Sequence, residues 1–127
     1  EKLIQKNNLQ NNFFLLGEIP NAKQYLPGLD VFTLPSVKEG LSYTLIEALS
    51  AGVPIVTTKV GGNPEIIEDK KNGLLVPPAD PTALSSAILT CLENQKLTQT
   101  FKQNNQEKAK QFSLNQAISQ TKKIYTK

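Results

Sequence analysis

Two carboxylates near a helix start are the residues of this sequence best placed to do chemistry. Glu39 stands beside Gly40 in a loop, and Glu47 follows eight positions later inside the apolar run 45–49. We predict a helix that begins near Ser42, and the free amide groups at such a helix end favour a phosphate. Because apolar residues flank Glu47 on both sides, we expect its carboxylate close to the protein interior, where it needs a hydrogen-bond donor.

A nucleotide-sugar fits this arrangement. A helix side chain points back toward the helix N-terminus, so Glu47 is able to reach a hydroxyl pair that lies beside the helix. The sugar would then lie at Glu39, the diphosphate at residues 41–44 and the ribose at Glu47. Two plainer interpretations stay open. The helix start is a capped turn that binds nothing, or Glu47 forms an ion pair with a lysine.

Composition excludes several other kinds of chemistry. The 127 residues contain no histidine and one cysteine, so Cys-His, Ser-His-Asp and histidine–metal schemes are excluded within this chain. The net charge is +3 and every basic residue is a lysine. These lysines are dispersed, which is typical of a solvated surface and not of a protein that binds nucleic acid. No apolar run reaches the length of a membrane span, so we expect membrane association only through regions outside this sequence.

Continuous apolar runs alternate with helical patterns along the chain. The runs at 13–16, 30–34, 54–57 and 73–76 are predicted strands of a parallel sheet that is covered on both faces. Helices are predicted at about 21–27, 43–51 and 64–69, which gives an α/β fold. Asp80-Pro81 then starts a helix to about residue 93, on which Cys91 is expected to be buried. A polar helix at 96–111 with little core and a last helix from Ser113 complete the prediction.

At these residues the sequence resembles a known family. The stretch "LPSVKEGLSYTLIEALSAGVPIVTTKVGGNPEII" is similar to the signature of retaining glycosyltransferases of the GT-B fold, group 1 or family 4. The similarity continues in "FFLLGEIPN", "NGLLVPPADPTALSSAI" and "FSLNQAISQTKKIY". It implies a Rossmann-like parallel sheet with flanking helices, the C-terminal half of a GT-B enzyme truncated at its N-terminus. Residues 1–127 would be one partial, donor-binding domain, with C-terminal helices at about 81–127.

The resemblance also implies roles for individual residues. Glu39 would contact hydroxyls of the transferred sugar at the reacting centre, and Glu47 would bind the ribose. The donor-binding segment between them would hold the diphosphate through backbone amides and comprises Gly40, Leu41, Ser42, Tyr43 and Thr44. Three residues after the first apolar run would lie near the base, namely Gly17, Glu18 and Ile19. The pair Gly61-Gly62 either approaches the donor or acceptor or forms a plain turn.

The resemblance implies transfer without a metal. The sequence agrees with this, since no Asp-x-Asp pair occurs. No cofactor is expected, and the nucleoside-diphosphate sugar is a substrate. Serine stands at position 42, where family members commonly have glycine. The family's arginine and lysine that grip the diphosphate, and its N-terminal acceptor domain, would lie upstream, so we expect the chain to be inactive alone.

The full-length protein is expected in the cytoplasm or peripheral at the inner face of the membrane. A non-catalytic nucleotide-binding module of the same fold is the alternative function. A sugar-nucleotide epimerase is disfavoured because that chemistry uses other acid–base residues.

Overall fold

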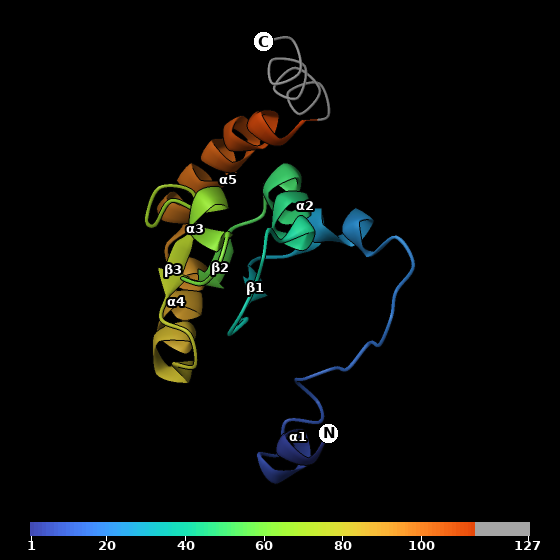
Figure 1. Ribbon diagram of the computed structural model, residues 1–127. Coiled ribbons are helices and arrows are strands. Elements are labelled where there is room, and N and C mark those ends of the chain that lie inside the picture. Colours follow the sequence, from blue (N-terminus) through green and yellow to red (C-terminus); the bar gives the residue numbers. More distant parts are fainter. Residues whose placement is uncertain (114–127) are drawn as a thin grey trace, which may run out of the picture.

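A three-stranded parallel sheet lies at the centre of the computed structural model, which describes residues 1–113 (Figure 1). Its strands are β1 (Phe32–Leu34), β2 (Ile55–Thr58) and β3 (Leu74–Val76), in the order β1-β2-β3. Thr33 and Leu74 pair with Val56 from its two sides. All four residues of β2 are buried, because this strand has a neighbour on each edge and helices on each face.

Helices cover both faces of the sheet. The core on one face joins Ile55 to α2 (Tyr43–Ala51) and α3 (Asn63–Ile66). The core on the other face joins Val56 to α4 (Pro81–Glu93) and α5 (Gln95–Ala109). Successive strand residues point to opposite faces, so these two neighbouring side chains belong to different clusters. The predicted α/β fold with a parallel sheet and flanking helices is confirmed.

The predicted helix starts and stops are also confirmed for the two helices with clear signals. Asp80 accepts a hydrogen bond from the amide of Ala83 at 2.9 Å, and Pro81 opens α4. Gly52 ends α2 with φ of 70°, a left-handed conformation that favours glycine. Cys91 lies on the buried side of α4 and is 2% exposed, as expected for a small apolar residue.

The predicted strand at 13–16 is wrong. These residues lie in an extended segment between α1 (Lys2–Lys6) and the 3-10 helix η1 (Ala22–Gly28), away from the sheet (Figure 1). No described strand pairs with the segment, and its four apolar side chains are 54–72% exposed. An apolar run signals a need for burial, and within residues 1–113 nothing covers this one. The helix predicted at 21–27 is the 3-10 helix η1, which follows this exposed segment.

The prediction that residues 94–111 carry little core is also wrong. Phe101 is fully buried on α5, and so is Asn105, whose Nδ2 donates to the carbonyl of Val53 at 2.9 Å. α5 packs against both α4 and α2, and the 3-10 helix η2 (Lys110–Phe112) follows it. The last helix predicted from Ser113 lies outside the described residues. Within residues 1–113, no helix is both long and apolar enough to span a membrane.

Candidate functional site

Glu39 lies in the loop between β1 and α2, at the carboxyl edge of the sheet. In open parallel sheets this edge is where ligands bind. The Glu39 side chain is half-buried, and its Oε1 accepts a hydrogen bond from Ser36 Oγ at 2.7 Å. The carboxylate is therefore held by its own loop, and its other oxygen has no hydrogen bond to a described residue.

The start of α2 presents a row of free backbone amides. Ser42 is the N-cap, and its Oγ accepts from the amide of Leu45 at 3.3 Å, which confirms the predicted helix start near Ser42. The amides of residues 40–44 donate no hydrogen bond to any described residue. Free amides at the helix start carry the positive end of the helix dipole, and together with those of Gly40 and Leu41 in the preceding loop they are suited to an anion. The sequence predicted this arrangement, and the structure places it directly after Glu39.

Glu47 is not directed into the core, which corrects our expectation. It lies on the exposed side of α2, whereas the buried residues of that helix are Leu45, Ala48 and Leu49. Side chains two positions apart on a helix do not share a face, so apolar neighbours do not bury it. Glu47 forms no ion pair or hydrogen bond with another residue in the described part of the chain, so the ion-pair alternative receives no support.

The turn between β2 and α3 lies against the Glu39 loop. The amide of Gly62 donates to the carbonyl of Gly40 at 3.0 Å. A Cβ added at Gly61 would lie 1.8 Å from the carbonyl oxygen of Glu39, and one at Gly62 would lie 2.8 Å from that of Gly40. The glycine pair therefore forms a turn that is packed closely on the backbone of the candidate site, and its approach to a donor or acceptor stays a prediction.

Hydrogen bonds from β2 and α3 complete the support of this loop. Thr58 Oγ1 donates to the carbonyl of Ser36, and Thr57 Oγ1 donates to that of Leu34 at 2.8 Å. Asn63 is fully buried, and its Nδ2 donates to Thr57 Oγ1 and to the carbonyl of Thr58. Sequence reasoning missed these supporting side chains. The one local signal was the Ser-x-x-Glu spacing between Ser36 and Glu39.

The chain was compared with known proteins. Residues 1–108 match the family model described as glycosyl transferases group 1. The chain belongs to this family. It is 31% identical to the O-antigen chain mannosyltransferase B of Escherichia coli, over 98% of this chain and 32% of that protein.

Solved structures of glycosyltransferases have the same fold. Sucrose-phosphate synthase of Thermosynechococcus elongatus superposes with a TM-score of 0.90 at 29% identity, over 98% of this chain and 32% of that one. Anabaena HepE in complex with UDP-glucose gives a TM-score of 0.86 at 30% identity, over 94% of this chain and 34% of that one. The chain thus spans about a third of the length of these relatives.

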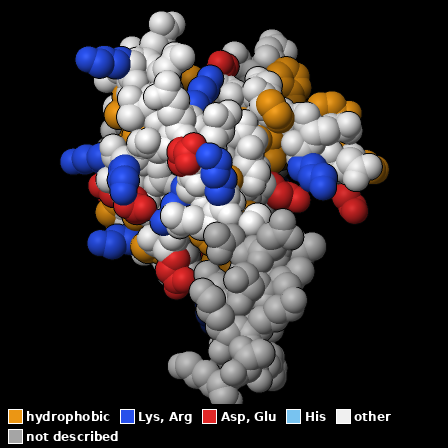
Figure 2. Space-filling model, turned by 90° about the horizontal axis from the view of Figure 1, so that it is seen from above, with side chains coloured by type: hydrophobic (Ala, Val, Ile, Leu, Met, Phe, Trp, Pro, Cys, Tyr) orange, Lys and Arg blue, Asp and Glu red, His pale blue; other side chains and the backbone are white. Residues whose placement is uncertain are grey.

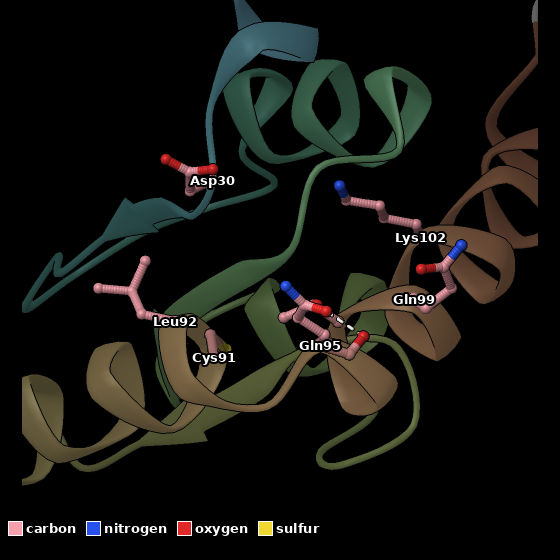
Figure 3. Close-up of a pocket in the computed structure, with 7 residues that line it drawn as sticks. Asp30, Cys91, Leu92, Gln95, Gln99 and Lys102 are labelled. Carbon is pink, nitrogen blue, oxygen red and sulfur yellow. Dashed lines mark hydrogen bonds between the residues drawn. The ribbon is translucent and has the colours of Figure 1, made fainter.

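Within the fold shared with this family, two cavities lie at opposite ends of the sheet. A pocket of about 200 Å³ lies at the carboxyl edge, where Pro35, Val37 and Thr58 face residues from the β3–α4 connection. A pocket of about 440 Å³ lies beyond the amino end of β1, and Asp30, Cys91, Gln95 and Lys102 line part of it (Figure 3). Burial raises the pKa of the Cys91 thiol, which keeps it neutral at physiological pH. The larger cavity contains none of the predicted site residues.

The three residues expected near the base belong to the segment that precedes η1. Ile19 lines an apolar pocket beside η1, while Gly17 and Glu18 belong to the exposed segment before it. No hydrogen bond joins residues 17–19 to the Glu39 loop or to α2 in the described region. Their role stays a prediction.

Figure 2 shows a face on which basic and acidic side chains are interspersed, without a patch of a single sign.

Proposed function

We propose that this chain is the donor-binding part of a retaining glycosyltransferase that uses a nucleoside-diphosphate sugar. The observation that carries the proposal is the row of free amides at residues 40–44, which lies between the half-buried Glu39 and the exposed Glu47. A diphosphate requires such donors, and hydroxyl groups on either side of it require acceptors such as carboxylates. The solved complex of a relative with UDP-glucose supports the same substrate class.

Each element of the site has a role in the proposed reaction. When the bond between the anomeric carbon and the diphosphate breaks, negative charge grows on the leaving phosphate. Backbone amides that already point at this position stabilise that charge without reorganisation. Glu39 holds the hydroxyls of the sugar near the reacting carbon, and Glu47 holds those of the ribose. The acceptor hydroxyl then attacks from the face that the diphosphate leaves, which retains the configuration, and its proton passes to an oxygen of the departing diphosphate.

The proposal concerns a longer protein than the chain described here. The relatives are about three times as long as this chain, and we infer that the acceptor site and further phosphate-binding residues lie in the additional part. The isolated chain is then inactive. The acceptor is a glycan, a lipid or another hydroxyl compound. The reaction proceeds in the cytoplasm and needs no metal. Residues 17–19 are assigned to the surroundings of the base in the complete protein.

Nucleotide release by the full-length protein tests the proposal. The protein is incubated with a panel of UDP-, GDP- and ADP-sugars, and Glu39→Ala and Glu47→Ala are compared with Glu93→Ala, an exposed glutamate at the end of α4. We expect both site variants to lose donor turnover and the control to retain it. Binding of a nucleotide-sugar without release of its nucleotide would instead support a non-catalytic nucleotide-binding module. Site variants as active as the control would overturn the site assignment.

A further inference from the structure

We propose that Ser36 is a positioning residue for Glu39, and that the Gly61-Gly62 turn is the template on which the Glu39 loop is formed. This inference rests on the proposed function of Glu39 and extends it to residues that do not touch the donor. Its physical basis is that a carboxylate on a loop acts reproducibly only when its rotamer and its backbone are both fixed by the surrounding structure.

The side-chain part of the inference follows from one hydrogen bond. Ser36 Oγ donates to Glu39 Oε1 at 2.7 Å, and both side chains are partly shielded from solvent. A hydrogen bond to a charged group in such surroundings is stronger than one between neutral groups. It occupies one carboxylate oxygen and leaves the other for a sugar hydroxyl. Ser36 therefore selects the direction in which Glu39 presents its free oxygen.

Ser36 is itself held by the neighbouring strand. Its carbonyl accepts from Thr58 Oγ1, and Thr58 is 2% exposed at the end of β2. The carbonyl of Thr58 accepts in turn from the fully buried Asn63. The position of the Ser36 backbone thus depends on two buried residues, one at the end of β2 and one at the start of α3.

The backbone part of the inference follows from the glycine pair. Gly61 has φ of 48°, and its missing side chain lets the carbonyl of Glu39 approach to a distance that no Cβ would permit. Gly62 approaches the carbonyl of Gly40 nearly as closely and donates a hydrogen bond to it. The amide row begins at Gly40. One turn therefore sets the position of the carboxylate and of the first free amide together.

A double-mutant cycle in the full-length protein tests the role of Ser36. Nucleotide release is measured with the UDP- or GDP-sugar that the wild type turns over, for Ser36→Ala, Ser36→Thr, Glu39→Ala and Ser36→Ala/Glu39→Ala. We expect Ser36→Ala to lower kcat about tenfold with little change in donor KM, the size expected for one hydrogen bond to a charged group. In the Glu39→Ala background the same change should alter kcat by less than about twofold. Ser36→Thr keeps the hydroxyl and should restore most of the rate.

Hydrogen exchange tests the role of the Gly61-Gly62 turn without relying on activity. Gly61→Ala and Ser36→Ala are compared with Gly28→Ala, where an added Cβ meets nothing within 4 Å. We expect faster exchange of the Gly62 amide, which donates to the carbonyl of Gly40, in Gly61→Ala, and unchanged exchange of this amide in Gly28→Ala. Ser36→Ala removes only a side-chain hydroxyl, so the Gly62 amide should stay as protected as in the wild type. Thr58→Val is a milder variant that should show the same effect if Gly61→Ala does not fold.

The outcomes separate this inference from the proposed function. If Glu39→Ala retains full activity, or no donor is turned over, the proposed function fails, and the exchange data alone decide whether the Gly61-Gly62 turn fixes the loop. If Glu39→Ala lowers the rate strongly, but Ser36→Ala lowers the wild-type rate and the residual rate of Glu39→Ala by the same factor, Ser36 has a general structural role and the inference is overturned. Unchanged exchange of the Gly62 amide in both Gly61→Ala and Thr58→Val overturns it as well.

Discussion

Replacement of Glu47 by glutamine should weaken donor binding and leave the fold intact. Glu47 lies on the exposed side of α2 and has no partner among the described residues, so its removal breaks no interaction within them. Glutamine has nearly the same shape and helix propensity as glutamate. We therefore expect the free energy of unfolding to change by less than about 0.5 kcal/mol, as for other exposed positions.

The expected loss of affinity follows from the hydrogen bonds assigned to the carboxylate. A hydrogen bond to a charged group contributes about 1.5 to 3 kcal/mol. Each 1.4 kcal/mol corresponds to a factor of about ten in Kd, so Glu47→Gln should raise the Kd of the donor about 10- to 100-fold. Glu47→Ala should raise it at least as much, because alanine also removes the acceptor oxygen that glutamine keeps.

Calorimetric titration of the full-length protein with a nucleoside-diphosphate sugar and urea unfolding provide the two measurements. Glu93→Gln is the matched control, because Glu93 is an exposed glutamate on another helix. The reasoning is refuted if Glu47→Gln binds the donor as tightly as Glu93→Gln does. It is also refuted if Glu47→Gln lowers the stability by several kcal/mol, since Glu47 would then have a structural role.

Three further predictions concern the core, the pH dependence and the metal. Phe101→Ala should lower the free energy of unfolding by about 3 to 5 kcal/mol in urea, because Phe101 is fully buried. Phe14→Ala, at an exposed phenylalanine, should change it by less than about 1 kcal/mol. Hydrogen bonds from Lys71 and then Lys108 lower the pKa of Glu68 below its ordinary value of 4.5. The stabilisation that Glu68 gives the folded state is therefore fully present above pH 4.5 and is lost as the pH falls through the lowered pKa. The stability difference between the wild type and Glu68→Gln, measured by urea unfolding below and above that pH, should therefore shrink on acidification. It should be small, since the Glu68 side chain is 42% and the Lys71 side chain 66% exposed. A metal chelator should leave nucleotide release by the full-length protein unchanged, and a loss that Mg²⁺ or Mn²⁺ restores would contradict metal-independent transfer.

The sheet and its two capped helices were predictable because their signals are local. A continuous apolar run between turn residues marks a strand such as β2, and Asp80-Pro81 or Ser42 marks a helix start within a few positions. The strand predicted at 13–16 failed for the complementary reason. Its apolar residues show that the segment needs cover, but the sequence of the segment does not contain the element that covers it.

The candidate site was predictable in its parts and not in its support. Glu39, Ser42 and the free amides follow from one loop and one helix start. The error at Glu47 came from reading neighbours along the chain, whereas burial on a helix follows positions three and four apart. The bond from Thr58 to Ser36 joins residues 22 positions apart, and no local pattern encodes such a contact.

Stability and donor recognition therefore depend on largely different residues of the candidate site. Glu47 is exposed and forms no hydrogen bond or ion pair with a described residue, so substitutions there should act on binding alone. Asn63 is fully buried and Gly61 allows no side chain, so substitutions there should lower stability and displace Glu39 together. Ser36 lies between these two groups. It is joined to the buried network only through its backbone carbonyl, so removal of its hydroxyl should release the Glu39 carboxylate while the loop keeps its attachment to β2.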